Sequence, residues 1–250
     1  MKQWFIKITE YVEDLLQDLN KLENWPEQVK VMQENWIGKS VGSSFKFLTV
    51  AEKGHTQHEI EIFTTRSDTI LGATCIVLAP EHPLLQSLVT SEQKQKVDEF
   101  LDQLTISCKG NREKVAAHQM KGVFLGSYAI NPISNEKIPI WSAEYVLSDY
   151  GSGAVMSVPA HDERDYKFSM SNGLPVKQVI FGKEGEVVSL PFTQDGFLSQ
   201  NGDVPKEISG VSSEDARKYI TSKWGKDNIN YKLKDWLVSR QRYWGKLFIF

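Results

Sequence analysis

Residues 44–63 read SFKFLTVAEKGHTQHEIEIF, and polar and apolar side chains alternate at both ends of this stretch. Successive side chains of a β-strand point to opposite faces, so a period of two predicts half-buried strands over 44–50 and 58–63. The polar residues Glu52-Lys53-Gly54 supply the turn between them. The stretch therefore predicts two strands at the start of a sheet.

The rest of the chain adds further strands and a few helices. Apolar and β-branched runs predict strands over 74–78, 122–130, 137–147, 154–158 and 176–181. Helical spacing and capping residues predict helices over 81–90, 91–106, 162–171 and 213–224. This pattern predicts a mixed α/β fold with a barrel-like β core surrounded by helices.

The N-terminal residues 1–22 carry apolar side chains at helical spacing. Trp25-Pro26-Glu27 breaks this pattern and begins a second short helix over 28–35. At the other end, residues 231–250 are strand-like and rich in aromatic residues. An apolar stripe needs something to pack against, so we expect the chain to be a fragment of a larger protein.

Composition narrows the functional class. The net charge is −3, from 29 basic and 32 acidic residues, so any contact with RNA must come from a local basic surface. Lys109, Arg112, Lys114 and Lys121 could supply such a surface, although a solvated face explains them as well. Only two cysteines occur, which argues against a disulfide framework or structural zinc and fits a reducing cytoplasm. The longest apolar run, 73–79, is too short to span a membrane.

Two polar motifs lie about ninety residues apart. Residues 64–72 read TTRSDTILG, and residues 153–165 read GAVMSVPAHDERD. Threonines at strand ends and charges at a helix start are common without any function. If the two segments share a pocket, however, their hydroxyls, carboxylates and guanidinium groups could hold an amino acid by its ammonium group and exclude one side chain by size.

Both motifs and both flanks resemble leucyl-tRNA synthetase. The flanks are residues 25–42, which contain NWIGKS at 35–40, and residues 235–245, DWLVSRQRYWG. In that family a Rossmann-type class I catalytic core is interrupted by a connective insertion that folds as an editing domain. The resemblance implies a catalytic-core flank over 1–40, an editing domain over 41–230 and a returning flank over 231–250. The ATP-binding HIGH and KMSKS signatures of the parent enzyme are absent from this sequence, so we expect no amino-acid activation by the chain itself.

The resemblance also implies roles for single residues. Thr69 would act as a size gate, Asp165 would anchor the aminoacyl ammonium, and Thr64 and Thr65 would help orient the hydrolytic water. Asp162 and Arg164 would support the pocket or contact the terminal adenosine. The remaining candidate substrate-binding residues are Arg66, Asp68, Tyr150, Met156 and Val158. Tyr150 could equally be a core residue. Met156 and Val158 are core residues unless they form the wall of the side-chain cavity.

Two neighbours of these residues need a separate interpretation. Ser67 stands where the bacterial motif often has proline, so the turn loses a fixed φ angle. His161 lies beside aspartates and has a pKa suited to a general base, but we favour a structural role for it.

The predicted function is hydrolysis of the aminoacyl ester of mischarged tRNA(Leu), carrying for example norvaline, isoleucine or methionine, while leucyl-tRNA(Leu) is spared. The expected partners are the mischarged 3′ end and the rest of the synthetase. The resemblance implies no metal and no organic cofactor, no membrane contact, a monomeric state and a cytoplasmic location. Two alternatives stay open: the editing domain of a valyl- or isoleucyl-tRNA synthetase, and a non-catalytic tRNA-positioning module.

Overall fold

The structure is a computed structural model that describes residues 4–50, 56–107, 120–148, 151–183, 189–200 and 204–238, without the side chains of 105–107. It divides into two compact units. The first unit comprises Met1–Val41 with Ile229–Phe250, and the second comprises Gly42–Asn228. The assignment of residues 1–40 and 231–250 to a catalytic core stays a prediction.

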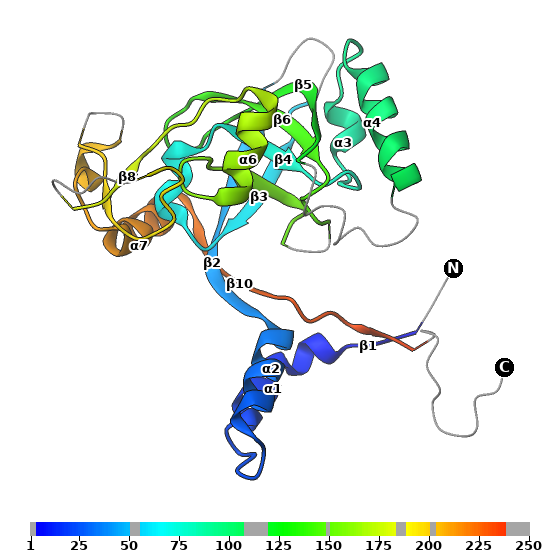
Figure 1. The fold of residues 1–250 in the computed structure, drawn as a ribbon, viewed down its shortest axis with the longest axis vertical. Coiled ribbons are helices and arrows are strands. Elements are labelled where there is room, and N and C mark those ends of the chain that lie inside the picture. The colour runs from blue at the N-terminus through cyan, green and yellow to red at the C-terminus, as the bar shows by residue number, and fades with distance from the viewer. Residues whose placement is uncertain are drawn as a thin grey trace. The chain divides into compact units, whose positions relative to one another are not determined.

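The second unit is built on an open mixed sheet (Figure 1). Its strand order is β10-β2-β5-β6-β4-β7, and β3 pairs with β2. Strands β4 and β6 run parallel, whereas β2–β3, β5–β6 and β4–β7 are antiparallel. The strands are β2 (Lys39–Thr49), β3 (Glu59–Thr64), β4 (Cys75–Leu78), β5 (Gly122–Ile130), β6 (Lys137–Ala143), β7 (Ala154–Ser157) and β10 (Lys226–Tyr231). The mixed α/β class is confirmed. The barrel-like closure is not, because no ladder joins β7 to β10 among the described residues.

The β2–β3 pair shows why the opening stretch forms strands. Phe45 lies opposite Ile62 and Phe47 opposite Ile60, and all four side chains are buried. Between them, Lys46 and Glu61 face each other on the outer side, and Lys46 Nζ lies 2.8 Å from Glu59 Oε1. Burial of one face fixes the register, because a slip of one residue would expose the whole apolar set.

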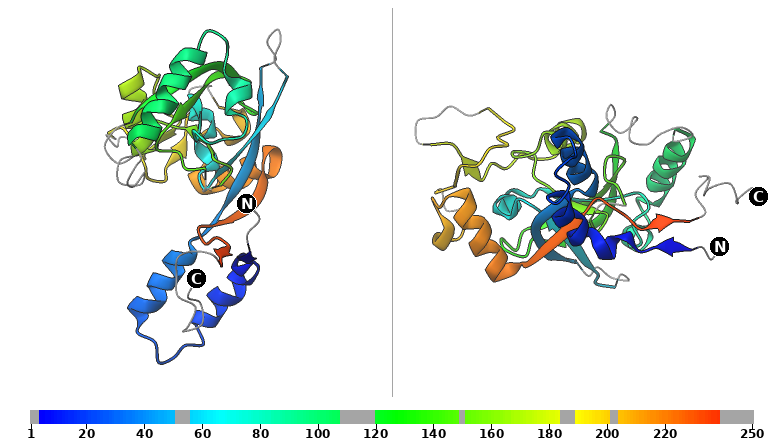
Figure 2. Two further views of the ribbon diagram at one scale, coloured as in Figure 1. Left: turned by 90° about the vertical axis from the view of Figure 1, so that its right-hand side faces the viewer. Right: turned by 90° about the horizontal axis from the view of Figure 1, so that it is seen from below.

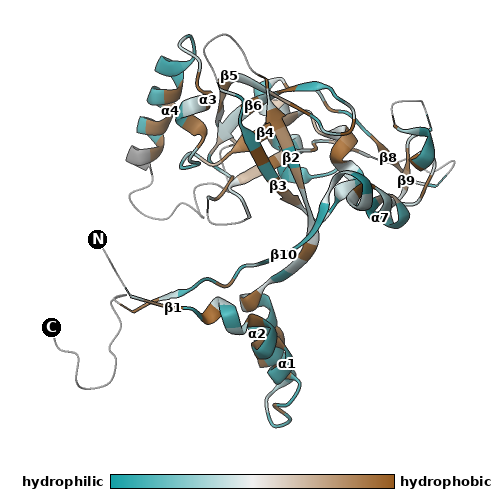
Figure 3. Ribbon diagram, turned by 180° about the vertical axis from the view of Figure 1, so that it is seen from behind, coloured by the Kyte–Doolittle hydropathy of each residue, from teal (hydrophilic) through white to brown (hydrophobic). Residues whose placement is uncertain are grey.

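Helices cover this sheet on more than one side. α6 (Glu163–Asn172) lies across β4 and β6 in Figure 1, and its Phe168 is fully buried against Cys75 and Val77. Figure 3 shows hydrophobic colouring on the inner strands and hydrophilic colouring on the outer turns of α4 and α7. The other elements of this unit are η2 (Ser67–Gly72), α3 (Leu85–Leu88), α4 (Lys94–Ser107), β8 (Ile180–Phe181), β9 (Phe197–Leu198), η3 (Lys206–Ile208) and α7 (Ser213–Trp224).

Three predicted elements of this unit are clearly shorter in the structure. The strand expected over 137–147 ends at Ala143 as β6. The helix expected over 81–90 is reduced to α3, which begins after a turn at 83–84 and ends where Val89 adopts an extended backbone. The strand expected over 176–181 is reduced to β8. Its Val179 and Ile180 amides donate to the His161 ring rather than to a neighbouring strand.

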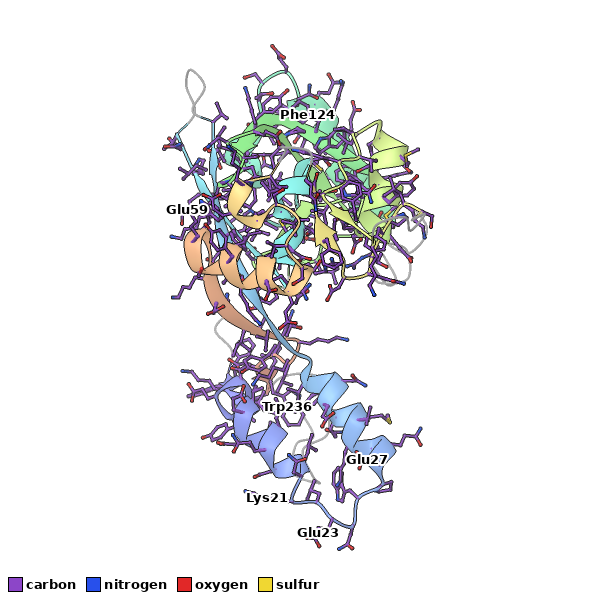
Figure 4. The ribbon with its side chains drawn as sticks, turned by 90° about the vertical axis from the view of Figure 1, so that its left-hand side faces the viewer. Lys21, Glu23, Glu27, Glu59, Phe124 and Trp236 are labelled. Carbon is purple, nitrogen blue, oxygen red and sulfur yellow. The ribbon has the colours of Figure 1, made fainter. Side chains whose placement is uncertain are left out.

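The first unit contains a pair of helices. α1 (Val12–Leu19) and α2 (Glu27–Ile37) lie side by side in both views of Figure 2. Figure 4 labels Lys21 and Glu23 in the turn that joins them and Glu27 at the start of α2. Three buried side chains, Val12, Ile37 and Leu233, form the small core of this unit. The unit also contains β1 (Phe5–Ile6), η1 (Ile8–Tyr11) and β11 (Trp236–Leu237), with β1 paired to β11.

The predicted N-terminal helix is therefore interrupted: residues 5–19 form a short strand, a 3-10 turn and α1. The strand expected over 231–250 falls mainly outside the described residues, although β11 lies within its first part. No helix among the described residues has the length and apolar character needed to cross a membrane.

Candidate functional site

Strand register brings the two polar motifs to one end of the sheet. In the antiparallel β4–β7 pair, Cys75 lies opposite Ser157, and Thr74 N donates to Ser157 O at 3.0 Å. The threonine motif leads into β4 from this end, through η2. The segment 158–165 leaves β7 at the same end. Two stretches about ninety residues apart therefore become neighbours.

A third segment, 192–195, bridges the two motifs. On one side, Phe192 N donates to Ala160 O at 2.7 Å. On the other side, Arg66 Nη1 donates to Thr193 O at 2.6 Å and Arg66 Nη2 donates to Gln194 O at 3.2 Å. This segment was not predicted from the sequence. Its turn-type residues TQDG at 193–196 are a weak signal that many surface loops share.

Arg66 organises the threonine motif through its backbone. Its N–H donates to Thr64 Oγ1 at 3.0 Å, and its carbonyl accepts a bond from Thr69 Oγ1 at 2.8 Å. Thr64 is half-buried, Thr65 is exposed and Thr69 is 1% exposed. Because the Thr69 hydroxyl already donates its proton, the direction of its methyl group is fixed.

The guanidinium groups of two arginines contact Asp68, whose side chain is fully buried. Arg66 Nη2 donates to Asp68 Oδ2 at 3.0 Å, and Arg217 Nη1 on α7 approaches the same oxygen at 3.4 Å. Arg217 also holds Asp195 with two parallel bonds of 2.8 and 2.9 Å. A buried carboxylate needs such cationic partners. Arg66 and Asp68 are predictable from the sequence, whereas Arg217 and Asp195 are not, because nothing in their local sequence connects them with the motif.

Ser67 is held by α7 rather than by a restricted φ angle. Its hydroxyl lies 3.2 Å from Thr221 Oγ1, which in turn lies 2.7 Å from Ser43 Oγ on β2. Ser67 Oγ also donates to Arg217 O at 3.3 Å. A buried hydroxyl that is hydrogen-bonded in this way ties the turn to two other elements.

Asp162 is the N-cap of α6. Its Oδ1 accepts bonds from the N–H groups of Arg164 at 2.8 Å and Asp165 at 3.1 Å. An N-cap carboxylate satisfies donors that the first helical turn leaves unpaired. The side chain of Arg164 is 70% exposed, and its Nε lies 3.9 Å from Asp162 Oδ1.

Asp165 is buried, with only 6% of the residue exposed to solvent. Its Oδ1 accepts a bond from the Tyr145 hydroxyl at 2.9 Å, and its Oδ2 accepts one from Val158 N at 2.9 Å. Burial, and secondly the charge of Asp162, raises the pKa of Asp165 to about 7. Burial also raises the pKa of Tyr145 well above its usual value, so its hydroxyl remains a donor. Tyr145 is a further partner that the sequence analysis did not identify.

His161 uses both ring nitrogens within the fold. Nδ1 donates to Phe192 O at 3.1 Å, while Nε2 accepts bonds from the amides of Val179 at 3.1 Å and Ile180 at 3.3 Å. Burial lowers the pKa of His161 to about 4. A neutral ring with both nitrogens engaged has no free position for a general base, which supports the structural role expected for it.

The other candidates fall into two groups. Met156 and Val158 are buried in the main hydrophobic core of the unit, together with Ile70 and Leu71. Tyr150 and the basic residues Lys109, Arg112 and Lys114 lie outside the described residues. Among the side chains that the structure describes, no group of three or more His, Cys, Asp or Glu could hold a metal ion.

Comparisons with known proteins agree on one family. A family model described as "Leucyl-tRNA synthetase, editing domain" matches residues 34–224. Among curated proteins, leucine–tRNA ligase of Fervidobacterium nodosum is 48% identical over 248 residues, covering 98% of this chain and 30% of that protein. The same enzyme of Acaryochloris marina is 44% identical over 254 residues, covering 98% of this chain and 28% of that protein.

A solved structure that matches this chain belongs to the same family. It is the crystal structure of the ternary complex of Agrobacterium radiobacter K84 agnB2 LeuRS, tRNA and LeuAMS, with a TM-score of 0.71 and 35% identity. The match covers 97% of this chain and 27% of that one. This chain thus spans about 30% of the length of the curated relatives. Taken with the paired motifs at one end of the sheet, these matches show that the chain belongs to the leucyl-tRNA synthetase editing-domain family.

Proposed function

We propose that this chain is the part of a leucine–tRNA ligase that hydrolyses the aminoacyl ester of mischarged tRNA(Leu) and spares leucyl-tRNA(Leu). The observation that carries the proposal is the position of Asp165. Its buried carboxylate lies at the same sheet end as the threonine motif, in a chain of the editing-domain family. The family match favours tRNA(Leu) over the tRNAs of the valyl and isoleucyl enzymes.

Asp165 is proposed as the anchor of the substrate ammonium group. A carboxylate offers about four acceptor positions, of which the Tyr145 hydroxyl and Val158 N–H use two. Burial penalises the ionised form, and an ammonium ion beside it would compensate for that penalty. The anchor therefore favours a substrate with a free α-amino group.

Thr69 is proposed as the size gate. Its side chain is buried, and the bond from Oγ1 to Arg66 O fixes its orientation. A fixed methyl group can exclude a branched leucyl side chain while it admits a smaller or differently branched one. Such steric selection is worth about 1–3 kcal/mol per methyl-sized group. This discrimination multiplies the one already made by the aminoacylation site of the parent ligase.

The hydrolytic water is proposed to be oriented by threonine hydroxyls and by the ribose hydroxyls of the substrate. Thr64 Oγ1 accepts a bond from Arg66 N, which leaves its own proton free to donate. Thr65 is exposed beside it. His161 has no free nitrogen for base catalysis, so the rate would come from positioning and from polar groups near the developing oxyanion.

The remaining candidates have supporting roles in this proposal. Asp162 and Arg164 would contact the terminal adenosine or hold the α6 start, and Arg66 and Asp68 would hold the threonine motif. Met156 and Val158 would form the wall of the side-chain cavity, and Tyr150 would contact the adenosine. The proposed partners are the 3′ end of tRNA(Leu) and the rest of the ligase, in a monomeric, cytoplasmic enzyme without a cofactor.

The test compares Asp165→Asn and Asp165→Ala with the unaltered chain on isoleucyl-tRNA(Leu). Asparagine keeps the shape and can still accept the Val158 N–H bond, but it removes the charge. Since loss of one partner of a buried charge pair costs about 2–5 kcal/mol, we expect deacylation to fall by about a hundredfold or more. Lys218→Ala is a matched control, because Lys218 forms an exposed ion pair with Glu214 on the outside of α7.

Three outcomes are informative. Loss of activity in both Asp165 variants but not in Lys218→Ala supports the proposal. Equal activity in the unaltered chain and both Asp165 variants would remove Asp165 from the mechanism. Absence of deacylation by the unaltered sequence within the full-length ligase would favour a non-catalytic, tRNA-positioning module.

A further inference from the structure

Four charged side chains from three separate segments meet beside the threonine motif. Arg66 and Asp68 come from the motif, Asp195 comes from the bridging segment and Arg217 comes from α7. Asp68 Oδ2 lies 3.0 Å from Arg66 Nη2 and 3.4 Å from Arg217 Nη1, and Arg66 Nη2 lies 3.8 Å from Asp195 Oδ1. The side chains of both arginines are about three-quarters buried, at 23% and 25% exposure.

Arg217 links the buried carboxylate of Asp68 to the exposed carboxylate of Asp195. It shares Asp68 with Arg66 and grips Asp195 with two parallel bonds. Bidentate arginine–carboxylate pairs fix orientation as well as adding energy. The bond to Arg217 lowers the pKa of Asp195, so this carboxylate stays ionised at neutral pH.

The four charges act on the proposed gate through Arg66. The Arg66 guanidinium donates to the carbonyls of Thr193 and Gln194, which directly precede Asp195. The Arg66 carbonyl accepts the bond from the Thr69 hydroxyl. A path of hydrogen bonds, joined by the covalent bonds of segment 193–195 and of Arg66 itself, therefore runs from Arg217 through Asp195 to Thr69.

We propose that Asp195 and Arg217 are positioning residues for substrate specificity: they hold the bridging segment against Arg66 and so fix the Thr69 side chain that excludes a leucyl ester. The inference rests on the proposed function and extends it to two residues outside both sequence motifs. Neither residue touches the substrate. Their loss should loosen the gate, so that leucyl-tRNA is hydrolysed as well, rather than abolish hydrolysis.

The main test variant is Asp195→Asn, chosen because the Asp195 side chain is 63% exposed and the fold should tolerate the change. Deacylation of isoleucyl-tRNA(Leu) and of leucyl-tRNA(Leu) is measured in the full-length ligase that carries this segment. The ratio of the two rates does not depend on the fraction of folded enzyme. We expect this ratio to fall about tenfold, the equivalent of one methyl-sized discrimination, with an unchanged melting temperature.

Three further variants define the mechanism. Arg217→Lys keeps the charge but cannot form the two parallel bonds, so its ratio should fall in the same direction. Asp195→Glu keeps a carboxylate and should restore the ratio to within about threefold of the unaltered enzyme. Lys218→Ala, which removes the neighbouring exposed ion pair on α7, should leave the ratio unchanged.

Each outcome either supports or overturns the inference. A lower ratio in Asp195→Asn and Arg217→Lys, with Asp195→Glu close to the unaltered enzyme, supports the inference. Ratios equal to that of the unaltered enzyme, or two rates that fall in parallel, would overturn it while leaving the proposed function intact. An unaltered enzyme that does not prefer isoleucyl-tRNA(Leu) would overturn the proposed function and this inference together.

Discussion

Arg66 shows how one residue can order a motif whose other members carry the proposed chemistry. Its amide, its carbonyl and its guanidinium contact Thr64, Thr69 and the bridging segment respectively. The hydroxyl of Thr64 acts as an acceptor and that of Thr69 as a donor, so two neighbouring threonines are left with different hydrogen-bonding capacity. This difference matches the distinct roles proposed for them.

Replacing Thr69 with alanine is expected to make the domain deacylate correctly charged leucyl-tRNA(Leu). Removal of a buried methyl and hydroxyl opens the space that a leucyl side chain needs, and we expect the rate on leucyl-tRNA to rise at least about tenfold. Thr69→Val keeps the bulk and loses only the bond to Arg66 O, so it separates the effect of side-chain size from the effect of the orientation that this bond fixes. Intact leucyl-tRNA in the alanine variant would show that Thr69 is not the gate.

Tyr145→Phe is expected to shift the pH dependence of editing upward. The Tyr145 hydroxyl stabilises ionised Asp165, so its loss should raise the pKa of Asp165 above its present value of about 7. The rate should therefore fall at neutral pH and recover at higher pH. The measurement is kcat/KM for deacylation between about pH 6 and about pH 9, corrected for spontaneous ester hydrolysis. A rate that drops equally at every pH would point to a packing defect instead.

At the level of elements, α6 was predicted to within one residue at each end. The expected range 162–171 and the observed Glu163–Asn172 differ by one residue, because Asp162 and Gly173 give strong local signals for the two helix ends. The strand expected over 176–181 was mostly wrong: only Ile180 and Phe181 pair with a strand, β9, while the amides of Val179 and Ile180 donate to the His161 ring. Sequence patterns report local preference and do not reveal a distant partner.

Removal of the α6 cap should reduce stability. Asp162→Ala leaves the N–H groups of Arg164 and Asp165 without their acceptor, and loss of such a cap costs about 1 kcal/mol. The measurement is the midpoint of urea unfolding. Asp162→Asn retains a capping oxygen and should remain within a few tenths of a kcal/mol of the unaltered chain. Alanine and asparagine variants of equal stability would contradict the capping role.

For the whole molecule, buried Asp165 predicts how stability changes with pH. Its pKa is about 7 in the folded chain against an ordinary value of 3.8, so folding favours the protonated form. This contribution is fully present below pH 3.8 and is lost as pH rises to about 7, above which it is constant. One pKa unit corresponds to about 1.4 kcal/mol, so the loss is on the order of 4 kcal/mol.

The measurement is the difference in unfolding free energy between the unaltered chain and Asp165→Asn across that pH range. Asparagine does not titrate, so the comparison cancels the contribution of the groups that do not interact with Asp165. The unaltered chain should lose stability relative to the variant as pH rises. A difference that stays constant with pH would mean that Asp165 titrates normally.

The sequence could predict the mixed α/β class and the two motifs, because periodicity and capping residues are local signals. It could not predict the partners that complete the arrangement. Tyr145 lies twenty residues before Asp165, and Arg217 lies 149 residues after Asp68. Their contacts depend on which strands pair and on where α7 packs, and no local pattern encodes either.

The pairing of Asp68 with both Arg66 and Arg217 on α7 has a consequence for the order of folding. Asp68 belongs to the first third of the chain, yet one of its two cationic partners lies near the far end. During synthesis Asp68 is therefore hydrated, or paired with Arg66 alone, until residue 217 has emerged from the ribosome. Contacts of such long sequence separation form slowly. The charges beside the proposed gate are thus expected to pair only after strands β2 to β7 have been synthesised, so that a chain released before residue 217 would have most of its sheet but would lack the contacts that fix the gate.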